Sequence, residues 1–275
     1  EKLFKIANTS PITIKNQVKF GNVNKWSPAD IYLATSKAKV DISQAVLKAK
    51  PKSYSFIDLN ILTSNLIDSG DLLPLSLKKT TKDVILQKVN FDKKSEIKAL
   101  EKVSLSSKKV TNWQPYKKVP FGTKGETRDM RAFLNNGGEI KFRHDPSAKR
   151  FVAEFIGGGA EARGGSIGSI KLFCELFALV DKETSKQVLK EYQEGEIQYF
   201  TDLKLIENLR GKDKKLFDHE RGAISAMNII NRIMPILKNW FQKTDKKKVD
   251  DFIRIIFQYI TSRTPLSGKF VIAKG

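Results

Sequence analysis

Hydrophobic and polar residues alternate near the start of the chain, and this alternation predicts β-strands. Ile12, Ile14, Val18 and Phe20 are spaced at multiples of two residues, which places them on one face of an extended segment. After a turn-rich stretch, residues 30–35 resume an extended pattern. We therefore expect two early strands.

A helical spacing of apolar residues follows these strands. Residues 40–50 are typical of a short helix that ends before Pro51. Residues 55–70 predict a longer helix that ends at Gly70, with four apolar residues on one side: Phe56, Leu59, Leu62 and Leu66. Residues 72–91 then predict a strand, a polar turn and a second strand. This order indicates a small mixed sheet with flanking helices.

The character of the chain changes between residues 102 and 125. This stretch contains six lysines, two prolines and no acidic residue, which favours a domain boundary. We therefore expect an α/β module over residues 1–101, a basic aromatic linker over 102–125 and a second domain over 126–275.

The second domain begins with a predicted β-hairpin over residues 138–157, which turns at Asp145 and Pro146. The rest of the chain has apolar residues at helical spacing. The sequence as a whole predicts an α+β protein, in which a mixed sheet with flanking helices precedes a hairpin and a helical C-terminal half.

The net charge of the chain indicates which class of partner it binds. Fifty Lys and Arg stand against 30 Asp and Glu, which gives a formal net charge of +20 and a pI of about 9.8. Such a balance favours polyanionic partners, and DNA is the first expectation. The alternative is that the lysines reflect a compositional bias and lie on a solvated surface.

The single cysteine, Cys174, lies in an apolar helical pattern and cannot form an internal disulfide bond. We therefore expect a reducing compartment inside a cell. The longest apolar stretches are shorter than the roughly 18 residues that a membrane span needs, so no membrane partner is expected.

Two short motifs suggest chemistry. Pro28-Ala29-Asp30 precedes one predicted strand, and Ser76-Leu77-Lys78 ends another. Together they resemble the PD-(D/E)xK nuclease superfamily, in which an aspartate and an acid-x-lysine motif converge at the edge of a sheet. The resemblance implies a restriction-endonuclease-like fold, with Asp30 and Lys78 at the ends of adjacent strands.

The resemblance also implies a Mg²⁺ site. Asp30 and the carbonyl of Leu77 would hold the metal, and Lys78 would orient the attacking water. Ser76 departs from the family pattern, because a hydroxyl replaces the second acid. Asp58 on the preceding helix, or the more remote Glu154, would then supply it. Both a nuclease and a nuclease-like protein that does not cut remain open.

Several basic and aromatic residues are candidates for nucleic-acid contacts. Trp113 and Tyr116 would stack on bases, or would instead anchor the linker to the protein surface. The candidate lysines for phosphate contacts are Lys25, Lys79, Lys108, Lys109, Lys117 and Lys118.

The glycine-rich stretch over residues 157–166 is similar in spacing to a nucleotide phosphate loop, but Gly165 stands at the lysine position, so no nucleotide is expected. Arg163 in this stretch would hold one backbone phosphate, or the stretch is a flexible connector.

A second, weaker resemblance gives a different function. The segments NKWSPADIY, LSLKK and ARGGS are similar to stretches of uncharacterised structural proteins of tailed-phage virions. That resemblance implies a non-enzymatic virion protein, whose basic surface contacts DNA or neighbouring subunits.

Overall fold

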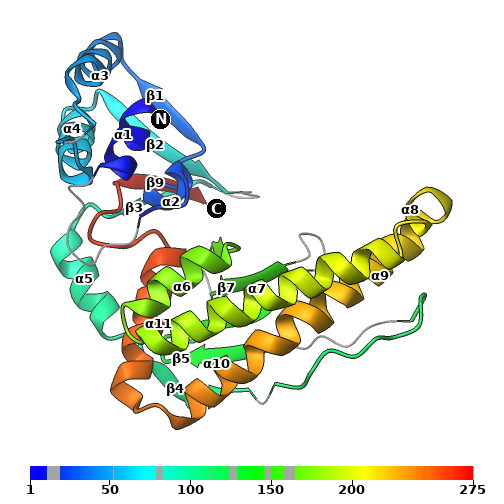
Figure 1. The fold of residues 1–275 in the computed structure, drawn as a ribbon. Coiled ribbons are helices and arrows are strands. Elements are labelled where there is room, and N and C mark those ends of the chain that lie inside the picture. The colour runs from blue at the N-terminus through cyan, green and yellow to red at the C-terminus, as the bar shows by residue number, and fades with distance from the viewer. Residues whose placement is uncertain are drawn as a thin grey trace. The chain divides into compact units, whose positions relative to one another are not determined.

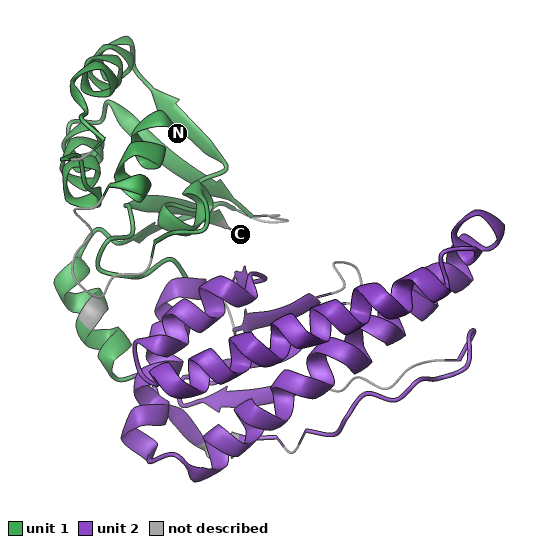
Figure 2. Cartoon of the chain, viewed as in Figure 1, with its two compact units in different colours: residues 1–102, 261–275 green, residues 103–260 purple. Residues whose placement is uncertain are grey.

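The computed structural model of the chain describes residues 1–10, 19–51, 53–78, 83–111, 113–123, 129–145, 150–157 and 165–274. The chain divides into two compact units, shown in Figure 2. Unit 1 comprises residues 1–102 and 261–275, and unit 2 comprises residues 103–260. The expected domain over 126–275 is therefore wrong at its C-terminal end, since the last 15 residues belong to unit 1.

Unit 1 contains a four-stranded mixed sheet (Figure 1). Its strands, in spatial order, are β1 (Ile31–Ala34), β2 (Leu72–Leu77), β9 (Phe270–Lys274) and β3 (Ile85–Val89). β1 is antiparallel to β2, β2 is parallel to β9, and β9 is antiparallel to β3. The mixed sheet agrees with the sequence, but β9 was not predicted. Most of the strand expected over residues 12–20 lies outside the described residues.

The described residues of unit 1 form five helices: α1 (Lys2–Thr9), α2 (Val23–Trp26), α3 (Ser36–Lys48), α4 (Phe56–Asp68) and α5 (Lys93–Glu101). Ala38 of α3, Leu66 of α4 and Leu72 of β2 form one buried cluster, so these helices cover one face of the sheet. The turn after α4 contains Gly70 at φ +76°, which is the left-handed conformation that glycine adopts without strain.

Unit 2 contains a five-stranded antiparallel sheet. Its strands, in spatial order, are β4 (Leu105–Val110), β5 (Met130–Leu134), β6 (Glu139–Asp145), β7 (Arg150–Ile156) and β8 (Ser166–Ile167). The predicted hairpin is confirmed as β6 and β7, which pair from Glu139 opposite Ile156 to Asp145 opposite Arg150. β4 lies within the stretch that was expected to be a linker, so that expectation is wrong for residues 105–110.

Helices cover one face of this sheet (Figure 1). The described helices of unit 2 are α6 (Ile170–Ala178), α7 (Lys182–Leu205), α8 (Leu209–Lys212), α9 (Lys214–Ser225), the π-helix η1 (Ala226–Ile230), α10 (Asn231–Lys243) and α11 (Lys246–Ile260). The short α8 lies at the far end of α7 and α9, away from the strands (Figure 1). Buried aromatic rings join the two layers, as where Phe142 of β6 contacts Phe173 of α6 edge-on. Cys174 is buried on α6.

The long helix α7 crosses η1 at Gly195. A Cβ atom at this position would lie 2.4 Å from the carbonyl oxygen of Asn228, so only glycine permits this close approach. None of the helices that the structure describes is long and apolar enough to cross a membrane.

Candidate functional site

The candidate site from the sequence lies at one end of the unit 1 sheet. Asp30 immediately precedes β1, and its backbone N–H donates to the carbonyl of Leu75 (2.9 Å). Its carboxylate accepts hydrogen bonds from the backbone N–H of Leu77 (2.6 Å) and from the hydroxyl of Ser76 (3.3 Å). Ser76 is only 2% exposed. The carboxylate therefore connects the start of β1 to the end of β2 and provides the buried Ser76 hydroxyl with a hydrogen-bond acceptor.

Lys78 follows β2 directly, so Asp30 and Lys78 lie at the ends of adjacent antiparallel strands, as the motifs predicted. The register places Asp30 opposite Ser76, and Lys78 is two residues further along β2. Because side chains alternate across a strand, all three belong to one face of the sheet. Lys78 is exposed and forms no ion pair with any described residue.

A complete metal site is not assembled here. Asp58 is the third residue of α4, and its carboxylate accepts from the N–H and hydroxyl of Ser55 in a capping box. These hydrogen bonds lower the pKa of Asp58 and commit its carboxylate to the helix start. Within the described parts of the chain, no group of three or more His, Cys, Asp or Glu side chains is placed to hold a metal ion.

Lys25, another predicted phosphate contact, lies on the short helix α2. Burial lowers the pKa of Lys25 to about 8, and its ammonium has no carboxylate partner among the described residues. Lys79 and Arg163 lie outside those residues, as do the side chains of Lys108 and Lys109, whose backbone belongs to β4.

The predicted basic aromatic linker is in part a structural element of unit 2. Residues 113–121, called the strap below, contact α9 and α10. Asn231 accepts from the N–H of Tyr116 (2.8 Å) and donates to its carbonyl (2.9 Å). His219 Nε2 lies 2.9 Å from the carbonyl oxygen of Val119, and Lys238 Nζ lies 3.5 Å from that of Trp113. Helix side chains thus hold the main chain of the strap.

These contacts decide the roles of the strap aromatics. Trp113 is 4% exposed and is a core residue, so it does not present its ring for stacking on a base. Tyr116 is half-buried, with its ring edge-on to His144. The anchoring interpretation therefore describes both residues. Lys118 pairs with Glu220 (2.7 Å), whereas the exposed Lys117 has no ion-pair partner in the described structure.

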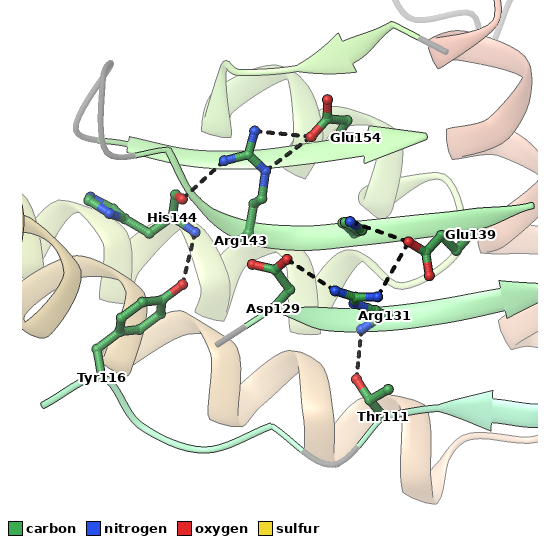
Figure 3. A network of polar contacts seen from close by, with 9 residues as sticks. Thr111, Tyr116, Asp129, Arg131, Glu139, Arg143, His144 and Glu154 are labelled. Atoms are coloured by element: carbon green, nitrogen blue, oxygen red, sulfur yellow. Dashed lines mark hydrogen bonds and ion pairs between the residues drawn. The ribbon is translucent and has the colours of Figure 1, made fainter. Parts of the chain in front are cut away.

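The face of the unit 2 sheet away from the helices carries a network of charges that sequence reasoning missed. Figure 3 shows Arg131 between Asp129 and Glu139, and Arg143 against Glu154. Arg143 contacts Glu154 through two nitrogens, each at 3.0 Å. The signal that could have found this face is the charge at every second position of β6, where Glu139, Lys141, Arg143 and Asp145 alternate with buried residues.

The charges on this face largely cancel. Glu139 forms ion pairs with Arg131 and Lys141, at 3.7 and 3.3 Å. Burial raises the pKa of Asp129, although Lys141, Arg131 and Arg143 act in the opposite direction. Among the contacts described, Arg131, Lys141 and Arg143 balance Asp129, Glu139 and Glu154, so these ion pairs connect neighbouring parts of the sheet and leave little excess charge for a ligand.

Comparisons with protein-family models, with curated proteins and with solved structures found no match. The residues and their geometry therefore carry the functional argument.

Proposed function

We propose that this protein binds DNA through the phosphate backbone, and that the corner formed by Asp30, Ser76 and Lys78 contacts DNA without cutting it. The observation that carries the proposal is the charge of unit 1. This unit contains 21 Lys and Arg against 10 Asp and Glu. An excess of this size on one small unit is typical of an electrostatic contact with phosphates.

The acidic residues of unit 1 do little to neutralise this excess. Asp58 and Asp92 cap helices, and Asp30 accepts from the backbone and from Ser76. Only three ion pairs occur among the described residues of the unit: Lys5–Glu1, Lys37–Asp71 and Lys269–Asp68. Among the described residues, Lys78 and several other exposed lysines of the unit, such as Lys39 and Lys98, thus form no ion pair and can contact an external anion.

Binding without cleavage is favoured because Ser76 stands where the nuclease pattern has its second acid. A serine hydroxyl supplies no negative charge for a metal ion, and here it donates a hydrogen bond to Asp30 instead. Mg²⁺ prefers carboxylate oxygens, and here one carboxylate already accepts two protein hydrogen bonds. The second candidate function is a metal-dependent nuclease. It is supported by the common sheet face of Asp30 and Lys78, and it needs an acid from outside the described corner.

The binding proposal is tested with mixed-sequence DNA at several salt concentrations. We expect an affinity that falls steeply between about 50 and 200 mM salt, because counterions are released when several phosphates are neutralised. Lys78→Gln should weaken binding slightly. An affinity that stays flat over this range would contradict the proposal. A folded protein that binds no DNA would instead favour the structural role in a virus particle.

The choice between binding and cleavage is tested with Mg²⁺ and plasmid DNA. The proposal expects no cleavage by the unaltered protein. If cleavage occurs, Asp30→Asn should abolish it and leave binding nearly intact, while Asp83→Asn, at an exposed acid of the same unit, should cut normally. Ser76→Glu adds the missing acid beside Asp30. Mg²⁺ should raise the melting temperature of this variant if the corner has the outline of a metal site.

A further inference from the structure

A second group of cations surrounds Phe91, between β3 and α5 in unit 1. The ammonium groups of Lys88 and Lys269 each lie 5.4 Å from the centre of the Phe91 ring. Lys93 begins α5, and its ammonium donates to the carbonyl of Pro265 (3.0 Å). The Lys269 ammonium also lies close enough to Lys93 to repel its charge, so Lys269 links a lysine near a strand end with one at a helix start.

The cluster has too few carboxylates for its cations. Lys269 pairs with both oxygens of Asp68, at 3.0 and 3.1 Å. Lys88 and Lys93 have no ion-pair partner among the described residues. Glu96 is near Lys93, but its carboxylate accepts from the backbone N–H of Asn90. At least one full positive charge in the cluster therefore lacks a counter-charge.

Burial, neighbouring cations and the helix dipole all make the excess positive charge of this cluster unfavourable in free energy. The side chain of Lys269 is only 15% exposed, so water screens it weakly. Burial, followed by the nearby Lys269 ammonium, lowers the pKa of Lys93. Lys93 and Lys94 also occupy the first turn of a nine-residue helix, where the helix dipole favours negative charge.

The backbone around the cluster is held firmly in this arrangement. Asn90 has a left-handed φ of 63°, and its side-chain amide donates to the carbonyls of Ser262 and Gly268 (2.9 and 2.8 Å). Gly268 in turn approaches the ring of Trp26, where a Cβ atom would lie 2.9 Å from the indole. The lysines therefore extend from fixed backbone positions.

We propose that Lys88, Lys93 and Lys269 form a binding site for a phosphate group. A dianion among the three ammonium groups would remove their mutual repulsion and would accept charge-assisted hydrogen bonds. The site lies at the opposite end of the sheet from Lys78, because β2 and β9 are parallel and Lys269 precedes β9 whereas Lys78 follows β2. It does not depend on the proposed function, since a free phosphate would suffice.

Inorganic phosphate is the probe, titrated at constant ionic strength with chloride as the reference anion. The double variant Lys88→Gln, Lys93→Gln should bind phosphate about tenfold or more weakly, because two charged donors are lost. Lys269 is kept, since it also pairs with Asp68. The matched control is Lys39→Gln, Lys98→Gln, which removes two exposed lysines of the same unit. It should bind phosphate within twofold of the unaltered protein.

Two results would overturn the proposal: no preference for phosphate over chloride in the unaltered protein, or an equal loss of affinity in both double variants. A short DNA duplex then identifies the source of the phosphate. Displacement of bound phosphate by the duplex assigns the site to the nucleic-acid backbone, and simultaneous binding assigns it to a free phosphate or phosphomonoester. Phosphate binding without any DNA binding would retain this site and contradict the proposed function alone.

Discussion

At the scale of single residues, Asp30 is the side chain with the most consequences in unit 1. Its carboxylate accepts hydrogen bonds from the N–H of Leu77, at 2.6 Å, and from the hydroxyl of Ser76, at 3.3 Å. Charged acceptors form stronger hydrogen bonds than neutral ones, and a buried donor that loses its acceptor is costly. Asp30 thus has a structural role that a metal-binding role would have to share.

Asp30→Ala should lower the free energy of unfolding by about 1–3 kcal/mol, because the buried Ser76 hydroxyl and the Leu77 N–H lose their acceptor. Urea denaturation measures the change in the free energy of unfolding, and amide hydrogen exchange of β2 shows whether the loss is local to this strand. Asp83→Ala at an exposed position is the control and should stay within about 0.5 kcal/mol of the unaltered protein. Equal stability of the two variants would show that these hydrogen bonds contribute nothing.

The resemblance to the PD-(D/E)xK superfamily implied that Asp30 and Lys78 lie at the ends of adjacent strands, and the pairing of β1 with β2 places them there. The resemblance could not show that Ser76 would donate to Asp30, since the direction of a hydroxyl depends on the folded surroundings. The burial of Trp113 could not be predicted from the sequence either, because the residues that contact it in the fold are distant from it in sequence. The carbonyl of Trp113, for instance, accepts from Lys238.

At the scale of elements, the spacing of apolar residues predicted those helices and strands whose main contacts are with residues nearby in sequence. The helix over α4 and the hairpin of β6 and β7 were both expected, and each depends on residues close in sequence. By contrast, β2 and β3 are consecutive strands that do not pair, since β9 lies between them. Periodicity cannot reveal such an insertion when the inserted strand is almost two hundred residues away.

The crossing of α7 and η1 gives an element-scale prediction. Gly195→Ala should destabilise unit 2 by about 1–3 kcal/mol, because the new methyl group would meet the Asn228 carbonyl. Gly211→Ala in α8 is the matched control. It meets no atom within 4 Å and should be neutral, or stabilising by about 0.4–1 kcal/mol. Thermal unfolding of both variants decides the matter, and a stable Gly195→Ala protein would contradict the close crossing.

Asp181 connects three helices and predicts a dependence on pH. It caps α7 and accepts from Trp240 of α10 and Lys248 of α11, each at 3.0 Å. Burial would raise the pKa of Asp181, but the hydrogen bonds and the Lys248 ammonium lower it to about 2. The folded protein therefore binds fewer protons than the unfolded chain between about pH 4 and pH 2.

Because the folded-state pKa is depressed, the stabilisation from Asp181 is present above about pH 4 and is lost as the pH falls toward 2. Asp181→Asn should lower the melting temperature at neutral pH and make its decline below pH 4 shallower. Asp251→Asn, at a partly exposed acid paired with Arg254, serves as the control and should keep the steep decline. An unchanged acid profile in Asp181→Asn would refute this role.

At the scale of the whole molecule, the two units are not consecutive halves of the chain. Unit 2 is inserted between the first 102 residues and the last 15, and those last residues supply a central strand of the unit 1 sheet. The composition change near residue 102 indicated the first boundary. The second boundary was missed, because the Ser-, Thr-, Pro- and Gly-rich residues 261–268 indicate a loop but do not show which unit the following strand joins.

Removal of residues 270–275 should therefore unfold unit 1 and leave unit 2 folded. Without β9, β2 and β3 each lose their pairing with it, and the backbone N–H and C=O groups that faced β9 lose their partners. Hydrogen exchange read separately for β2 and β6 measures this, with removal of Gly275 alone as the control. Loss of protection in β6 as well would show that unit 2 depends on unit 1.

The central position of β9 also sets an order of folding during synthesis. A ribosome completes residues 103–260 before it adds residues 270–274, so unit 2 has all of its strands while unit 1 still lacks one. Until then β2 and β3 are nascent strands with unpaired edges, the kind of surface that chaperones recognise and that aggregates readily. The part of the protein that is made first is thus the part that finishes folding last.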